Sequence, residues 1–260
     1  MITASIPAMV HCSRARRLLA LAALAVAGCA TLTQDTDLNQ RYGAANPARF
    51  DVPVAPAPGQ PRWADVKPIL DNRCVVCHAC YDGPCQLKLT AWEGLARGAS
   101  PQSVYDSSRL REASMTRLFA DAQLPSAWRT KGFTAVLNER PASEANLPAS
   151  VIYRSLALKR AHPLPEGTVL PSSFTLGLDR PQQCPSIEAY ASFEKDHPLW
   201  GMPYAMPGLD ARELDIITRW LAAGAPYEGA APPPNAIARQ VREWETFLNG
   251  DSLKERLMSR

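Results

Sequence analysis

One short segment of the chain concentrates residues that bind metals and form covalent cross-links. Residues 72–89, NRCVVCHACYDGPCQLKL, hold four of the seven cysteines and one of the four histidines. A zinc site, a disulfide knot and a covalently attached haem are the three interpretations that fit such a cluster. Because the redox state of the compartment decides among them, the N-terminus constrains what this segment can become.

The first 28 residues have the pattern of a bacterial secretory signal. Arginines precede the run LLALAALAVA, and its ten apolar residues are too few to cross a bilayer. The pattern predicts cleavage and a periplasmic protein. The sequence VAGC, which ends at Cys29, also resembles a lipoprotein processing box and predicts a lipid tether there. Ordinary cleavage nearby, with Cys29 incidental, is the alternative.

Export affects the expected state of the thiols and the net charge. Exported thiols tend to form disulfides, which makes a zinc ribbon less favourable. Loss of residues 1–28 lowers the basic residues from 28 to 25, equal to the 25 acidic ones. A neutral chain offers no electrostatic reason to bind nucleic acid or anionic lipid. Contact with a membrane surface must therefore be apolar or pass through a lipid anchor.

Composition divides the mature chain into three regions. Residues 29–61, rich in proline and alanine, predict a semi-extended tether, with order beginning near Trp63. Residues 62–230 predict a mainly α domain with long loops, because helical patterns alternate with many of the 24 prolines. Residues 231–260 predict the start of a further helical region. A helical pattern is still running at Arg260, which is what a truncated reading frame would produce.

Apolar spacing and capping residues predict several helices within this domain. A short helix from Trp63 leads into the cysteine cluster, and a capping box of Thr90 and Glu93 predicts another. Weaker patterns predict helices within 103–121 and 148–160. The clearest helix follows Asp210, which forms a capping box with the residue at its third position and heads an apolar stripe. That stripe and the residues that cap and end the helix are Glu213, Leu214, Ile217, Trp220, Leu221, Gly224 and Pro226.

Cys74, Cys77 and His78 form the C-x-x-C-H pattern of c-type haem attachment. The two thiols can each form a thioether with a haem vinyl group, and the adjacent histidine can ligate the iron. A thioredoxin-like redox pair would not require the histidine. With the export signal in place, the pattern predicts a covalently bound haem whose iron is held by His78.

A second iron ligand is commonly methionine or histidine. Met202 is the first candidate because Gly201 and Pro203 flank it in a loop that precedes the clearest helix. Met206, which also precedes a proline, is the alternative. Whichever methionine does not ligate iron is expected to pack in the core.

Apart from Cys29, three cysteines of the mature chain remain outside the haem pattern, namely Cys80, Cys85 and Cys184. A disulfide between Cys80 and Cys85 would close the loop CYDGPC and leave Cys184 single. The sequence does not choose among the three pairings, which therefore stay open.

Two longer segments resemble a known family. RCVVCHACYDGPCQLKLTAWEGLARGAS is similar to the haem segment of bacterial fatty acid cis/trans isomerases, and HPLWGMPYAMPGLDARELDIITRWLAAGAPY is similar to a later part of these proteins. The resemblance implies a cytochrome c-like haem domain in the periplasm, with Cys74 and Cys77 as attachment points and His78 as iron ligand. It also implies haem-dependent conversion of cis-unsaturated acyl chains, in membrane phospholipids or free fatty acids, to trans without ATP or a nicotinamide cofactor.

A monohaem cytochrome that transfers electrons without turning over a substrate is the alternative function. The residues themselves fit it equally well, and no catalytic residue besides the haem iron is indicated. Because members of the family are longer, we expect the 260-residue chain to bind haem without turnover. No apolar segment is left to line an acyl groove once the helical stripes are assigned to the core.

Overall fold

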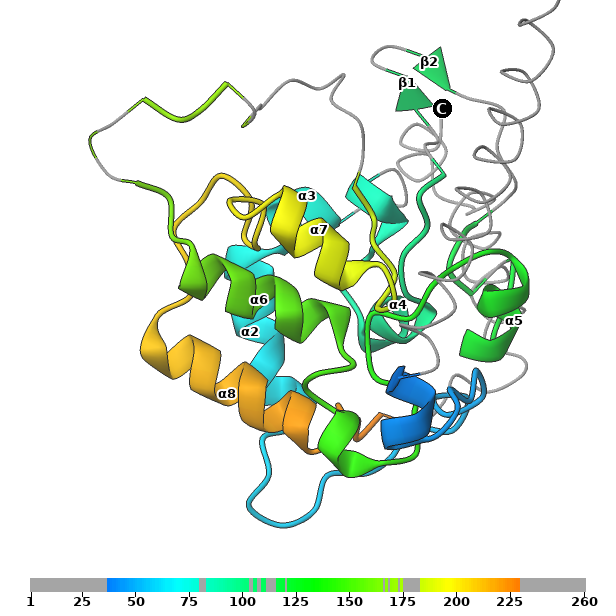
Figure 1. Cartoon of the computed structure of the whole chain (residues 1–260). Helices are drawn as coiled ribbons and strands as arrows, with labels where there is room; N and C mark the ends of the chain where they lie inside the picture. The colour runs from blue at the N-terminus through cyan, green and yellow to red at the C-terminus, as the bar shows by residue number, and fades with distance from the viewer. Residues whose placement is uncertain are drawn as a thin grey trace, which may run out of the picture.

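A computed structural model describes residues 37–79, 83–102, 105–106, 109–110, 116–119, 121–165, 167, 169–172, 174 and 183–229 of the chain. This part is rich in helix, which confirms the mainly α prediction (Figure 1). Its named helices are α2 (Trp63–Arg73), α3 (Val75–His78), α4 (Trp92–Arg97), α5 (Pro125–Thr130), α6 (Val151–Ala161), α7 (Tyr190–Asp196) and α8 (Ala211–Ala222). The 3-10 turns are η1 (Pro84–Gln86) and η2 (Ser143–Ala145).

Helix α8 forms as its sequence predicts. The side chain of Asp210 accepts a hydrogen bond from the backbone N of Glu213 (2.8 Å), and the Glu213 carboxylate accepts one from the backbone N of Asp210 (3.0 Å). The buried face carries Ile217, Trp220 and Leu221. Helix α8 packs against α2 and α6 through this face (Figure 1), so the strongest local pattern also organises the core.

The chain beyond α8 returns to the beginning of α2. The backbone N of Trp63 and that of Ala64 donate to the two carboxylate oxygens of Glu228, at 3.1 and 3.4 Å. An acidic side chain is favourable there because the first turn of a helix has unpaired N–H groups. Tyr227, the residue before Glu228, stacks on Trp92 of α4 with 4.8 Å between ring centroids. The two ends of the predicted domain therefore meet.

Within the described residues 37–62, single side chains pack against the core, which differs from the predicted tether. Phe50 is only 4% exposed and belongs to the main hydrophobic cluster. Arg49 donates from Nη1 to the carbonyl of Asn138 (2.9 Å) and from Nη2 to Oδ1 of Asn146 (3.0 Å). A composition rich in proline and alanine predicts little regular structure, but it does not prevent single side chains from anchoring a loop.

Two local predictions are wrong. Helix α4 begins after Ala91 without a side-chain cap, so Thr90 does not form the predicted capping box, although Gly98 ends the helix with φ of 85°. Within 103–121, the described residues form two short antiparallel strands, β1 (Tyr105–Asp106) and β2 (Arg109–Leu110), where a helix was expected. The predicted helix within 148–160 is confirmed by α6.

The described residues contain no helix that is both long and apolar enough to span a bilayer. Residues 1–36 and 230–260 lie outside them. The secretory signal, the lipid tether at Cys29 and the further helical region at 231–260 therefore stay predictions.

Candidate functional site

The cysteine motif lies where α2 gives way to α3. Helix α2 ends at Cys74, whose backbone N donates to the carbonyl of Leu70 (2.8 Å), and the carbonyl of Cys74 then accepts from the backbone N of His78 (3.0 Å). This short second turn brings Cys74, Cys77 and His78 together. Both thiols are free, with Cys74 half-buried and Cys77 exposed. The predicted short helix from Trp63 that leads into the motif is confirmed by α2.

Burial controls the ionisation of the motif. It raises the pKa of the Cys74 thiol to about 11, and the neighbouring Arg73 cation only partly opposes this shift. Burial also lowers the pKa of His78, against the opposing effect of backbone groups of Leu87 and Pro84. The imidazole is therefore neutral at neutral pH, and its buried Nδ1 has no hydrogen-bond partner among the described residues.

The motif lines a cavity of about 300 Å³. Met202 and Met206 also line it, so the structure brings both predicted methionines to the same cavity as His78 without choosing between them. The remaining wall is largely aliphatic and is made by Leu70, Val76, Leu87, Leu89, Ala99, Val136, Val151, Ile152, Leu156 and Ile217. The expectation that no apolar segment is left to line a groove is therefore wrong, because residues from several helices and loops converge here.

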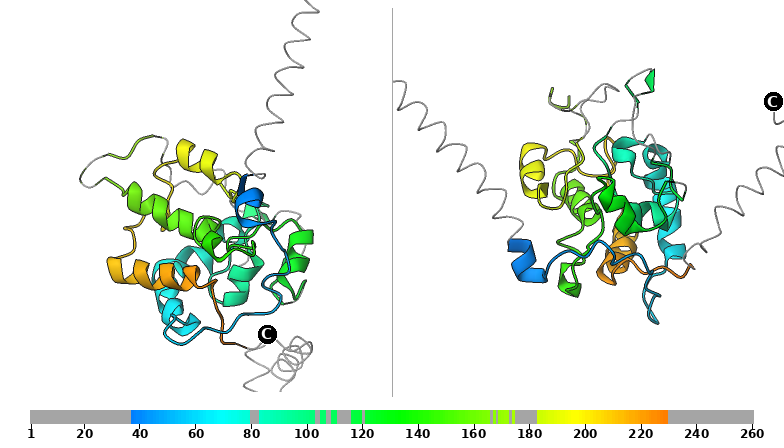
Figure 2. Two further views of the ribbon diagram at one scale, coloured as in Figure 1. Left: turned by 60° about the horizontal axis from the view of Figure 1, so that its bottom comes forward. Right: turned by 90° about the vertical axis from the view of Figure 1, so that its right-hand side faces the viewer.

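The cavity lies between two walls that come from distant parts of the chain. Helices α2 and α3 with η1 form the motif wall, and α6, α7 and residues 200–208, here called the methionine loop, form the methionine wall. In the right-hand view of Figure 2, α7 in yellow lies on the opposite side of the molecule from the cyan segment of α2. The site therefore depends on long-range packing.

A close backbone contact fixes the methionine loop on α6. The backbone N of Met202 donates to the carbonyl of Ser155 (2.9 Å). A Cβ atom at Gly201 would lie 2.2 Å from the backbone N of Lys159, so only glycine permits this approach. The Lys159 side chain is 2% exposed, and its Nζ is buried without a hydrogen-bond partner among the described residues. Burial lowers its pKa.

Arg73 connects the two walls. It immediately precedes the motif, and its Nη2 donates to the carbonyl of Gly208 at the end of the methionine loop (2.5 Å). Its Nε lies 3.4 Å from a carboxylate oxygen of Glu213 in α8. The side chain that adjoins the first motif cysteine thus also holds the loop that carries both methionines.

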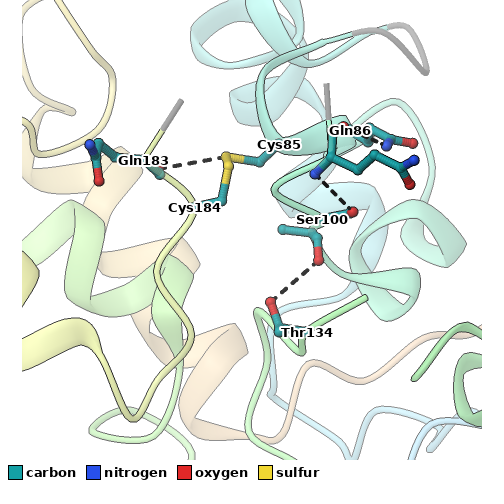
Figure 3. Close-up of a disulfide and its surroundings, with 8 residues drawn as sticks. Cys85, Gln86, Ser100, Thr134, Gln183 and Cys184 are labelled. Atoms are coloured by element: carbon teal, nitrogen blue, oxygen red, sulfur yellow. Dashed lines mark hydrogen bonds between the residues drawn. A yellow bond between two sulfur atoms is a disulfide. The ribbon is translucent and has the colours of Figure 1, made fainter. Parts of the chain in front are cut away.

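A disulfide between Cys85 and Cys184 makes a second connection across the cavity (Figure 3). The two residues are 99 positions apart, and both line the cavity. The structure thus selects one of the three pairings that the sequence left open. The Cys85 sulfur is no longer a thiolate ligand for zinc, and Cys80 lies outside the described residues.

A buried arginine supports the turn that carries Cys85. Arg97 is fully buried, and its guanidinium donates to the carbonyls of Gln86 and Thr116 while lying 4.9 Å from the ring centroid of Phe133. Burial lowers its pKa to about 10. The sequence offers no signal for this role, because Arg97 looks like an ordinary basic residue in the last turn of a helix.

The sequence pattern also does not predict the aromatic side chains that line the cavity. Phe193, Trp200 and Tyr204 line the methionine wall. They occur within the segment FEKDHPLWGMPY, which shows no helical or strand period that would place its rings on one surface. Only the tertiary fold brings them together.

Comparison with known proteins adds information on the methionine wall. A family model described as fatty acid cis/trans isomerase matches residues 113–260, more than half of the chain. The chain belongs to the fatty acid cis/trans isomerase family. Membership assigns it isomerase activity on fatty acids. No curated protein and no solved structure matches it.

The family match covers only part of the cavity. It includes α7, the methionine loop and α8, and it begins after the motif at residues 74–78. The family assignment therefore rests on the methionine wall, and the haem remains to be argued from the residues of the motif wall.

Proposed function

We propose that this isomerase carries one c-type haem in the cavity and uses it to convert cis double bonds of acyl chains to trans. Cys74 and Cys77 would hold the haem through thioethers, and His78 would ligate its iron. Met202 or Met206, on the other wall, would supply a second ligand. The substrates would be fatty acids or the acyl chains of membrane phospholipids, met in the periplasm by a protein that the membrane holds through Cys29.

The observation that carries this proposal is that one apolar cavity contains the complete donor set. Two free thiols, a histidine and two methionines all line it. A neutral imidazole is the form that ligates iron, and burial favours that form of His78. Its Nδ1 is buried without a partner among the described residues, which is costly unless a bound group organises the ring. The residues therefore fit a haem.

The chain would contribute orientation and exclusion of water. When bound, ferric haem would supply an electron acceptor that could weaken the π bond enough for the acyl chain to turn. The aliphatic residues of the cavity would hold the acyl chain by burial of apolar surface, worth about 0.8 kcal/mol for each CH₂ group. Arg73 and the Cys85–Cys184 disulfide would keep the two walls at a fixed separation.

Electron transfer without turnover is the second candidate. It is favoured by the presence of two methionines in the cavity that holds His78, because a methionine bound to iron would leave no open position for an olefin, and isomerisation would then require outer-sphere electron transfer or release of the methionine. The two candidates differ in one observable property, which is the formation of trans product.

The test uses the holoprotein from a strain with working cytochrome c maturation. We expect haem colour to stay with the protein on a denaturing gel. Because the cavity supplies the apolar lining that the sequence did not predict, we also expect gas chromatography to detect trans fatty acids after incubation with oleic acid. Cys77→Ser should strongly reduce attached haem, whereas Ser192→Ala, an exposed position outside the cavity, should retain it. A colourless wild-type protein would refute haem attachment, and a coloured protein without trans product would favour electron transfer.

A further inference from the structure

The aromatic rings of the cavity, other than the imidazole of His78, belong to one wall. Phe193 of α7, together with Trp200 and Tyr204 of the methionine loop, lines the cavity. Among the described lining residues, the only aromatic ring outside this wall is the imidazole of His78. The cavity is thus aliphatic over most of its surface and aromatic beside the two methionines.

These rings support one another in a continuous row. Trp200 and Tyr204 lie edge to face, with 5.4 Å between centroids. The imidazole of His197 lies 4.6 Å from the Trp200 centroid and 5.4 Å from that of Phe193. Phe174 stacks on Tyr204 at 4.8 Å. Rings held on several sides keep their orientation when a ligand enters.

The rings that line the cavity are not fully buried in the hydrophobic core. Core rings such as Trp63 and Trp220 are 8% and 0% exposed. Phe193, Trp200 and Tyr204 are half-buried, and all three line the cavity. They therefore retain surface that a molecule in the cavity can contact.

We propose that Phe193, Trp200 and Tyr204 form the subsite that binds the double bond of the acyl chain and stabilises it while it turns. The inference rests on the proposed function, because it assumes that an acyl chain enters this cavity. Aliphatic walls suffice to bind a saturated chain. A wall of aromatic faces is specifically favourable for an electron-poor centre, because each face of the π system carries negative potential.

The chemistry of the reaction creates such a centre. A double bond can turn only after its π bonding is weakened, and withdrawal of one π electron leaves a radical cation, in which a single π electron remains and the two carbons share a positive charge. The electron returns after rotation, so no atom is gained or lost and no net oxidation occurs. A cation within about 6 Å of a ring centroid is stabilised most strongly where water is excluded. This stabilisation would raise kcat by between about twofold and thirtyfold for each ring.

The experiment separates the effect of side-chain size from that of the negative potential of the aromatic face, at single positions of the holoenzyme. Trp200→Phe keeps an aromatic face, whereas Trp200→Leu removes it. A series of phenylalanines with increasing fluorine content at position 193 keeps the shape of Phe193 and progressively removes its negative face. Tyr153→Leu, a half-buried ring of α6 outside the cavity, is the matched control. The readouts are kcat and KM for oleic acid and the haem absorption spectrum.

We expect Trp200→Leu to lower kcat by about tenfold or more, Trp200→Phe to lower it less, and each added fluorine at position 193 to lower it further, with an unchanged haem spectrum. Tyr153→Leu should match the wild type. Wild-type turnover combined with kcat values that are insensitive to fluorination and to Trp200→Leu would overturn the aromatic subsite alone. A parallel change in the haem spectrum would also overturn it, since the rings would then act by packing on haem. Absence of wild-type turnover would instead refute the proposed function.

Discussion

The disulfide between Cys85 and Cys184 should contribute a large part of the stability of this fold. It closes a loop of 99 positions in a chain whose two cavity walls are otherwise joined by noncovalent contacts. A closed loop of about 100 residues lowers the entropy of the unfolded state enough to stabilise the fold by about 4.7 kcal/mol. Because single domains have free energies of unfolding of about 5–15 kcal/mol, Cys85→Ser/Cys184→Ser should lose about a third or more of the stability of the fold.

The measurement is a urea titration of the holoprotein followed by circular dichroism. We expect the double variant to lose about 2–5 kcal/mol of unfolding free energy, the range observed when native disulfides are removed. A phosphine reductant should bring the wild type to the same midpoint and should not affect the double variant, since thioether bonds to haem resist reduction. A loss below about 1 kcal/mol, with the reductant inert on the wild type, would refute the Cys85–Cys184 pairing.

Three further results are expected around the methionine loop. Gly201→Ala should destabilise the protein by about 1–3 kcal/mol in urea titration, because its Cβ would lie 2.2 Å from a backbone N. The control Gly208→Ala should destabilise it less, because its Cβ would meet only a flexible side-chain atom at 3.3 Å. Equal losses of unfolding free energy in the two variants would contradict the close contact at Gly201. Lys159→Met should raise the free energy of unfolding by about 1 kcal/mol, because it removes a buried amine without a partner in the described residues, and a loss would show that the Nζ is satisfied. In the ferric holoprotein, Met202→Ala should abolish a near-infrared charge-transfer band that Met206→Ala retains, and the reverse would identify Met206 as the iron ligand.

The sequence predicts those parts of the fold that depend on neighbouring residues. The capping box at Asp210 and the apolar stripe of α8 lie within one short segment, and the structure confirms both. The helix from Trp63 that leads into Cys74 is equally local, and α2 confirms it. Local information was insufficient at Thr90, where a matching pair of residues is present but the backbone turns into the helix one residue later.

The cavity could not be predicted because its parts are far apart in the chain. The Cys85–Cys184 pairing depends on how α6 and α7 return to the motif, and no spacing rule spans 99 positions. The aromatic row comes from a segment without regular periodicity. Phe50 lies in a stretch whose composition predicts a tether, yet a single buried ring and the anchored side chain of Arg49 suffice to bind that stretch to the core.

The two walls of the proposed site would differ in what they determine. The motif wall contains the residues that would hold a haem, which many electron carriers also require. The methionine wall lies within the region that matches the isomerase family. If substrate turnover distinguishes this protein from an electron carrier, the residues responsible should lie on the methionine wall. Phe193, Trp200 and Tyr204 satisfy this condition, and Arg73 joins their loop to the motif. Substrate chemistry would therefore be determined by the methionine wall, and covalent attachment of the cofactor by the motif wall.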